Sequence, residues 1–164
     1  MLLLTLPHSM TLHLPDEAAT EAFGAALGGA MAAGDTVLLS GPLGAGKSAL
    51  ARAAIRRLLG DWRAEVPSPS YTLINVYDTE AGPVWHADLY RLGGGGDEMA
   101  ELGLDEAMGR VILFVEWPDR LGAALPERYL SIRLDMTDGG GRDAAIAFHG
   151  EGWERLRAAL EGSH

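Results

Sequence analysis

A three-layer α/β fold, with a central, partly parallel mixed sheet flanked by helices, is the architecture that this sequence predicts. Short β-rich runs alternate with stretches of helical periodicity along the 164 residues. A glycine-rich segment, 41–48, connects one of these strands to one of these helices. With 48% apolar residues the chain has enough apolar surface for one core, so residues 1–164 are predicted to form a single domain.

The N-terminal half is predicted to run strand, helix, strand, loop and helix. Residues 10–14 alternate in polarity as a half-buried strand does, and the segment 15–33 is helical in pattern with acidic residues in its first turn. A compact β-rich run follows at 36–40. After the glycine-rich loop, apolar side chains share one face of a helix at 48–59.

The C-terminal half is predicted to add five strands and two short helices. The strands are expected at 71–77, 84–90, 111–116, 129–135 and 144–149, and the helices near 98–108 and 151–161. The glycine tracts 93–96 and 139–141 are predicted to be loop tips, because glycine runs oppose regular structure on entropic grounds.

Composition excludes several classes of function. The chain has no cysteine, which rules out disulfide scaffolds, thiolate zinc sites and cysteine nucleophiles. Its 13 basic and 23 acidic residues give a formal charge of −10, the opposite of what neutralising a phosphate backbone requires. We therefore expect no strong direct binding of nucleic acid.

Two local features of charge and hydropathy also bear on function. A solvated helix face is favoured over a docking patch for the local basic cluster Arg52, Arg56, Arg57 and Arg63. The apolar start 2–6 has no basic residue before it and ends at Pro7, so neither a signal peptide nor a membrane span is predicted. A soluble cytoplasmic protein is the resulting expectation.

The segment 41–48 reads GPLGAGKS and fits the phosphate-binding loop G-x-x-x-x-G-K-[ST] in its expected place between a strand and a helix. Its glycines permit a tight turn whose backbone N–H groups converge on phosphate oxygens. Lys47 supplies a mobile charge for the β- and γ-phosphates, and Ser48 offers a hydroxyl to Mg²⁺. Lys47 is the only lysine in the chain, so lysine appears only where the loop requires it.

A triphosphatase also needs acids near the metal and the attacking water. Glu116 ends the predicted strand 111–116, and Asp88 and His86 project to one face of a second strand because side chains alternate. For a lone acid or histidine at such a position, the residues alone slightly favour a purely structural role over a catalytic one.

Three further motifs follow the loop in order: SPSYTL at 68–73, HADLYRL at 86–92 and VEWP at 115–118. Together with the loop they resemble the TsaE family, bacterial ATPases needed for the threonylcarbamoyl modification of adenosine 37 in tRNA. The resemblance runs from about residue 15 to the end, with Gly141-Arg142 matching a weaker late motif. It implies a P-loop NTPase-like fold, ATP and Mg²⁺ as cofactors, and the TsaB and TsaD proteins as partners.

The resemblance also implies roles for individual residues. By this resemblance, the residues that bind the phosphates are Gly44, Ala45, Gly46, Lys47, Ser48 and Ala49. Ser48 and Glu116 would organise the metal, while Asp88 would position water near the γ-phosphate. The segment 68–73 resembles the family's switch-like loop, and the hydroxyls of Ser70 and Thr72 in it would respond to the nucleotide state. Thr20 is expected near the adenine.

The sequence departs from the family pattern in three places. Pro42 stands where an aspartate is frequent, and Ser48 and Ser70 stand where threonine is usual. Both serines keep the hydroxyl. Pro42 removes a charge and an N–H, so any role of the usual acid in loop geometry or partner contact does not carry over.

Other functions remain open. A small-molecule kinase would use the same loop, although no arginine-rich lid segment is evident, and a GTPase is disfavoured because no N-K-x-D motif is present. A non-hydrolysing module would bind nucleotide as a structural ligand. The sequence offers no arginine finger beyond Arg91 and Arg142, so we expect slow hydrolysis by the chain alone and stimulation by partners.

Overall fold

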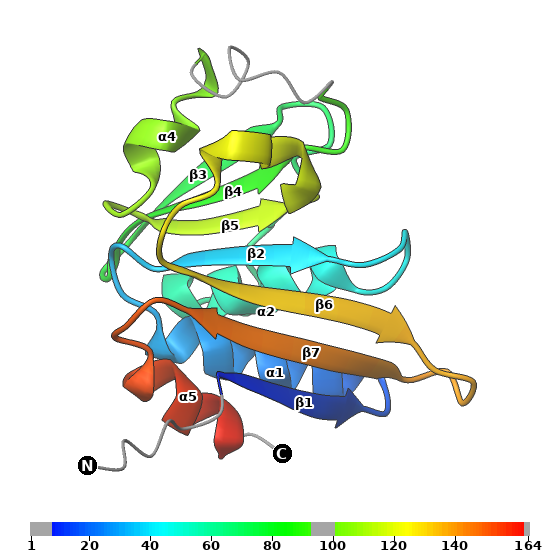
Figure 1. Cartoon of the computed structure of the whole chain (residues 1–164). Helices are drawn as coiled ribbons and strands as arrows, with labels where there is room; N and C mark the ends of the chain where they lie inside the picture. Colours follow the sequence, from blue (N-terminus) through cyan, green and yellow to red (C-terminus); the bar gives the residue numbers. More distant parts are fainter. Residues whose placement is uncertain (1–7, 93–100, 163–164) are drawn as a thin grey trace.

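The computed structural model describes residues 8–92 and 101–162, and its strands form one seven-stranded sheet in the order β1-β7-β6-β2-β5-β4-β3 (Figure 1). Its elements are β1 (Ser9–Leu14), α1 (Glu17–Ala30), β2 (Thr36–Ser40), α2 (Lys47–Leu59), β3 (Ile74–Thr79), β4 (Gly82–Asp88), α4 (Leu104–Ala107), β5 (Ile112–Glu116), the 3-10 helix η1 (Pro118–Ala124), β6 (Tyr129–Met136), β7 (Arg142–His149) and α5 (Glu154–Glu161).

The sheet is mixed, as predicted. Strands β6, β2, β5 and β4 run parallel in its centre, whereas β3 on one side and β7 and β1 on the other are antiparallel to their neighbours. The carboxyl ends of β2, β4 and β5 consequently meet at one edge. In open α/β sheets this edge is where ligands bind.

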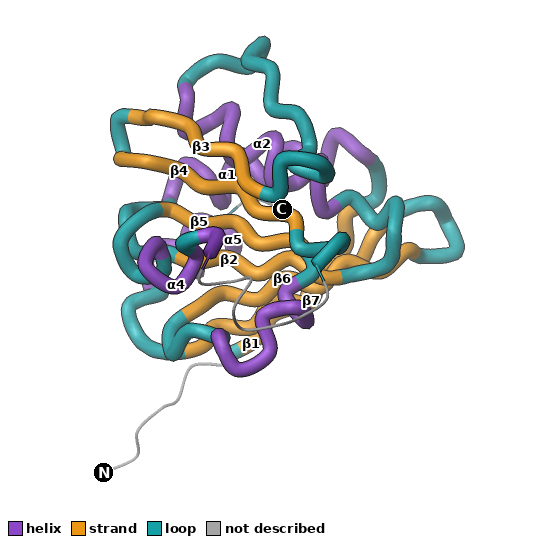
Figure 2. The backbone as a smooth tube through the Cα atoms, turned by 90° about the horizontal axis from the view of Figure 1, so that it is seen from above, coloured by secondary structure: helices purple, strands orange, loops and turns teal. Residues whose placement is uncertain are grey.

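Helices cover both faces of the sheet, which confirms the three-layer fold (Figures 1 and 2). Val37 and Leu39 of β2 point into the core shared with α1, α2 and α5. Leu38, between them, points to the opposite face and packs with Leu104 of α4 and Leu121 of η1. Successive side chains of a strand point to opposite faces of the sheet. Because helices cover both faces here, β2 is buried on both sides.

Two glycines bring α1 against α2. A Cβ atom at Gly24 would lie 2.5 Å from the carbonyl oxygen of Leu50, and one at Gly28 would lie 2.3 Å from that of Ala54. Only glycine permits backbones to approach so closely. This contact places the first turns of α1 beside the loop that precedes α2.

The observed element boundaries differ from the predicted ones by a few residues. The largest shift at the start of a strand is in β3, which begins at Ile74 instead of 71. Leu73 adopts a positive φ of 68°, and its N–H donates to the carbonyl of Pro69 at 2.8 Å, so 69–73 is a turn. Side-chain periodicity carries no signal for such a turn.

Of the helix predicted at 98–108, residues 101–102 and α4 (Leu104–Ala107) are helical and are separated by Gly103, whose φ is 77°, while 98–100 and the glycine tract 93–96 lie outside the described residues. The tract 139–141 is the turn between β6 and β7, which confirms it as a loop tip. In the part of the chain that the structure describes, no helix is both long and apolar enough to cross a membrane.

A buried carboxylate ties the amino end of β2 to the C-terminal part of the chain. Asp35 is only 3% exposed and accepts hydrogen bonds from Arg128 at 2.9 Å, from Arg155 at 2.7 Å and from the backbone N–H of Ala32 at 2.8 Å. Three donors compensate the cost of burying this charge.

We expect Asp35→Ala to lower the free energy of unfolding by about 2 kcal/mol or more, because charge-assisted hydrogen bonds are lost and two arginines lose their partner. Urea denaturation measures this. The matched control is Asp135→Ala, whose pair with Arg133 is exposed and is expected to contribute about 0.5 kcal/mol. Equal losses in the two variants would contradict a structural role for Asp35.

Candidate nucleotide-binding site

The glycine-rich loop leaves the carboxyl end of β2 and enters α2 at Lys47. Gly41, Gly44 and Gly46 all have positive φ, at 135°, 81° and 106°. At Gly41 a side chain is also excluded by space, since a Cβ atom would lie 2.2 Å from the carbonyl oxygen of Leu134. The sequence therefore builds the compact turn that a phosphate cradle requires, with a helix N-terminus behind it.

Arg142 of β7 fixes this loop from outside. Its guanidinium donates to the carbonyl oxygens of Ala45 at 2.9 Å and Gly44 at 3.1 Å, and also to those of Gly140 and Gly141. All three of its nitrogens are thus committed to backbone carbonyls. This arrangement makes Arg142 a clamp on the loop, and it is not placed as an arginine finger.

Lys47 is buried at the mouth of the loop. Its ammonium donates to the carbonyl oxygens of Gly41 at 2.7 Å and Pro42 at 2.9 Å and lies 4.4 Å from the centre of the Trp117 ring. Burial lowers the pKa of Lys47, while the nearby Glu116 oppositely favours its charged form. The loop's cation is therefore held by weak acceptors that a phosphate can replace.

The two predicted acids lie on neighbouring strands. Asp88 of β4 is directly paired with Glu116 of β5, and both are buried. The Ser48 hydroxyl donates to Oε1 of Glu116 at 2.9 Å, and Asp88 accepts the backbone N–H of Tyr90 at 3.0 Å. Burial raises the pKa of Asp88, and the charge of Glu116 adds to this shift.

These groups open into a cleft of about 290 Å³. It is lined by Leu43, Gly44, Gly46, Lys47, Ser48, Ala49, Ser68, Ser70, Asp88, Glu116 and Trp117. On the other side of the loop, a hollow of about 400 Å³ is lined by residues from α1, the loop, the start of α2, the β6–β7 turn and the start of β7, among them Thr20, Ala45, Ala49 and Arg142. The two spaces share Gly44, Gly46 and Ala49, as a site for phosphates and an attached nucleoside would.

The switch-like residues are only partly brought to the cleft. Ser70 lines it and shares a hydrogen bond of 3.0 Å with Ser68, whereas the Thr72 hydroxyl donates to Asn75 and Thr72 does not line the cleft. Arg91 also lies outside it. The Arg91 guanidinium stacks 5.1 Å from the ring of Tyr71 and donates to the Ser70 carbonyl at 3.4 Å.

The oxygen atoms of the cleft fit Mg²⁺ better than a softer metal. Ser48, Asp88 and Glu116 supply only hydroxyl and carboxylate oxygens, which this ion prefers. Within the described residues, no three His, Cys, Asp or Glu side chains are grouped so as to hold a metal by themselves. A metal here would share its coordination with phosphate oxygens and water, which is usual for Mg²⁺.

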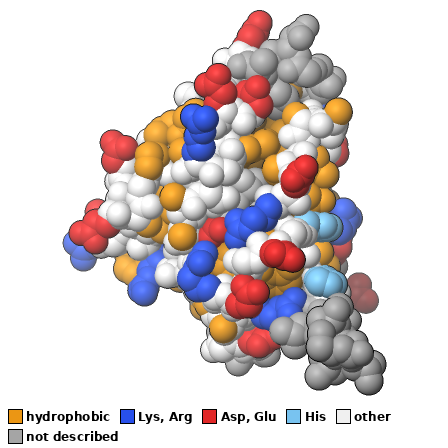
Figure 3. Space-filling view, turned by 60° about the vertical axis from the view of Figure 1, so that its left-hand side comes forward, with side chains coloured by type: hydrophobic (Ala, Val, Ile, Leu, Met, Phe, Trp, Pro, Cys, Tyr) orange, Lys and Arg blue, Asp and Glu red, His pale blue; other side chains and the backbone are white. Residues whose placement is uncertain are grey.

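The basic cluster predicted on α2 has a structural use. Arg52 and Arg56 donate to the carbonyl oxygens of Val66 and Ala64 at 3.1 and 3.0 Å, and so hold the chain that leads into the switch-like segment. On the face drawn in Figure 3, basic side chains are scattered among acidic ones. Arg52 and Arg56 are thus half-buried and bound to the backbone, whereas Arg57 and Arg63 are exposed to solvent as predicted.

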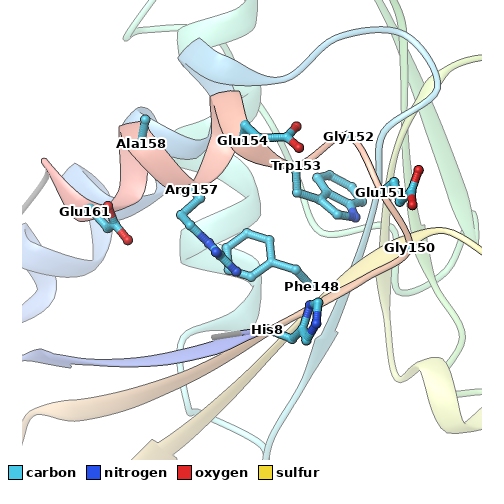
Figure 4. Close-up of a pocket in the computed structure, with 10 residues that line it drawn as sticks. All are labelled: His8, Phe148, Gly150, Glu151, Gly152, Trp153, Glu154, Arg157, Ala158 and Glu161. Carbon is cyan, nitrogen blue, oxygen red and sulfur yellow. The ribbon is translucent and has the colours of Figure 1, made fainter. Parts of the chain in front are cut away.

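A further hollow, of about 470 Å³, lies between the end of β7 and α5, away from the loop (Figure 4). Arg157 lies 4.8 Å from the centre of the Phe148 ring, and the Trp153 indole donates to the carbonyl of His149. None of the residues predicted for nucleotide binding lines this hollow.

Several features of the site could not be predicted from the sequence. They include the contact of Trp117 with Lys47 and the hollow that Gly140 and Thr20 line together. Trp117 has a positive φ of 60°, which turns the chain after β5. The polarity pattern of the sequence does not predict this turn. The VEWP motif was the available signal, because it follows the strand end that carries Glu116.

A glycine-rich loop between a central parallel strand and a helix, with a buried lysine, a serine and two acids at the same sheet edge, defines the class of protein. It is a P-loop nucleotide-binding protein.

Comparisons identify the family. The model described as threonylcarbamoyl adenosine biosynthesis protein TsaE matches residues 14–144. The TsaE protein of Streptomyces coelicolor is 38% identical over 127 residues, covering 74% of this chain and 84% of its own length. That of Nostoc sp. is 33% identical over 148 residues, covering 87% and 88%. This chain belongs to the TsaE family.

A solved structure agrees in fold. The crystal structure of Bacillus subtilis YdiB matches with a TM-score of 0.76 and 26% identity, over 96% of this chain and 97% of that one.

Proposed function

We propose that this protein binds ATP with Mg²⁺, hydrolyses it, and thereby serves the formation of N6-threonylcarbamoyladenosine at position 37 of tRNA, acting on a complex of TsaB and TsaD. The relatives named above are tRNA threonylcarbamoyladenosine biosynthesis proteins, which supports the pathway. The observation that carries the chemistry is the pairing of Asp88 with Glu116 beside Ser48 and Lys47.

Each group has a role that follows from its place. The loop amides and Lys47 bind the phosphates, and the hollow beside Thr20 receives the nucleoside. Ser48 and Glu116 would hold Mg²⁺, and the ion would supply positive charge to offset the charge on the phosphates. Asp88, with a pKa raised by burial, orients the attacking water and accepts its proton.

Two alternatives differ at this site. A kinase needs a binding site for a second substrate beside the γ-phosphate, whereas Ser68, Ser70 and Trp117 line the cleft there. A non-hydrolysing module needs no acid pair at the phosphate end. The proximity of Asp88 to Glu116 therefore favours hydrolysis.

Ser48→Ala is expected to reduce ATP affinity in the presence of Mg²⁺ by about tenfold and to leave the metal-free affinity nearly unchanged. The hydroxyl bonded to Glu116 is the group removed, while the loop amides and Lys47 remain. Calorimetry with Mg²⁺ and with EDTA measures both affinities. Equal losses under the two conditions would count against a metal-binding role for Ser48.

The partner assignment is tested by co-purification with the TsaB and TsaD proteins of the same cell, with and without ATP. We expect the chain to be retained on that complex and its recovery to change when ATP is added. The Ser70→Ala, Thr72→Ala variant probes the switch-like segment, because Ser70 lines the phosphate cleft. Absence of retention in both conditions would contradict the assignment.

A further inference from the structure

His86 is a buried ionisable residue beside the site that the proposed reaction does not use. It lies on β4, two residues before Asp88, and therefore projects from the same face of the strand. The side chain is 1% exposed. Its Nε2 atom lies 2.6 Å from Oε2 of Glu116, close enough for a strong hydrogen bond to a carboxylate.

This contact completes the coordination of the Glu116 carboxylate. Oε1 accepts the hydroxyl of Ser48, and Oε2 accepts the N–H of His86. A glutamate side chain has three rotatable bonds, so one donor alone would leave the carboxylate free to turn. With a donor on each oxygen, its plane is fixed and Oε1 is directed at the phosphate loop.

The histidine ring is not held by a second polar contact. Its Nδ1 atom is buried and has no hydrogen-bond partner among the described residues. Because a carboxylate only accepts, the nitrogen that faces Glu116 carries the proton. The polar function of this ring is thus directed at Glu116 alone.

We propose that His86 is the positioning residue for Glu116, which it holds in the orientation that organises Mg²⁺ with Ser48. The inference rests on the proposed function, since it takes Glu116 as a metal-organising acid. A histidine that merely filled the core would affect the stability of the fold, and would have no selective effect on the metal-dependent part of nucleotide binding.

The test compares His86→Gln with His86→Asn. Both are neutral amides, but the longer glutamine brings an N–H donor close to the position of Nε2, whereas asparagine ends nearer to Nδ1. The probe is an ATP analogue with a non-hydrolysable β–γ bridge, titrated by calorimetry with Mg²⁺ and with EDTA. His149→Gln, on β7 and away from the cleft, is the control for replacing a partly buried histidine.

We expect the asparagine variant to lose about tenfold or more of the affinity gained through Mg²⁺, as happens when a group that orients a metal ligand is removed. The glutamine variant should keep most of this gain, and the metal-free affinity should change by no more than about twofold in either variant. Thermal melting of both variants separates a loss of folding from a loss of metal-dependent binding.

Two results would overturn the inference. The first is a Mg²⁺-dependent gain that the asparagine variant retains, and the second is an equal loss with and without Mg²⁺. If the asparagine variant does not fold, the glutamine variant decides the question. A glutamine variant that folds but has lost the affinity gained through Mg²⁺ would also overturn the inference. A wild-type protein whose affinity is indifferent to Mg²⁺ would instead overturn the proposed metal site and the inference together.

Discussion

Replacement of Lys47 by alanine is expected to abolish tight binding of ATP, with a loss of about 100-fold or more in affinity. The ammonium is the single lysine charge in the chain, and it lies at the mouth of the phosphate loop on two carbonyls and the Trp117 ring. Arg142 cannot replace it, because its nitrogens are committed to backbone carbonyls. A loss of 100-fold corresponds to about 2.8 kcal/mol, within the range for charge-assisted hydrogen bonds.

Calorimetry with ATP and Mg²⁺ measures this affinity. The matched control is Arg63→Ala, which removes the same charge from an exposed position outside the cleft and is expected to bind ATP normally. Affinity retained by the Lys47→Ala variant would refute the assignment of the loop. Equal losses in both variants would point to a general effect of net charge.

Asp88→Asn is expected to leave ATP bound and to slow its hydrolysis by about tenfold or more, which is a typical loss for a missing general base. The amide keeps the size of the side chain and an oxygen for the Tyr90 N–H, but it cannot accept a proton from water. Glu116→Gln should act in the same direction, because it removes the charge that organises the metal.

Single-turnover measurements, with the protein in saturating excess over ATP, separate this effect from binding. Asp78→Asn, an exposed acid on β3, is the control and should hydrolyse ATP at the wild-type rate. Normal rates in both the Asp88 and the Glu116 variants would show that these acids are structural. Hydrolysis would then depend on other residues, and the catalytic roles proposed for Asp88 and Glu116 would be wrong.

Local patterns were sufficient to predict the parts of the fold that a short segment determines. The strand, loop and helix around GPLGAGKS are one such unit, because glycine spacing and the change of period from 2 to 3.6 lie within consecutive residues. The strands that carry Asp88 and Glu116 were also predicted, although not that these two acids would be paired in register.

Contacts between segments that are distant in the sequence could not be predicted from local patterns. Arg142 holds the carbonyls of Gly44 and Ala45 from nearly the other end of the chain, and no local pattern encodes that pairing. The positive φ values at Leu73 and Trp117 are set by the surrounding packing, against the preference of both residue types. The boundary of β3 and the contact of Trp117 with Lys47 depend on these two residues.

We propose that this protein hydrolyses ATP and that its activity depends on the partner complex. The most direct test is the rate of phosphate release from ATP by the chain alone and by the chain with TsaB and TsaD. We predict slow release by the isolated chain and stimulation of about tenfold or more by both partners together, because the described residues place neither Arg91 nor Arg142 in the cleft as an arginine finger. Full turnover by the isolated chain, or no stimulation by the partners, would contradict the account.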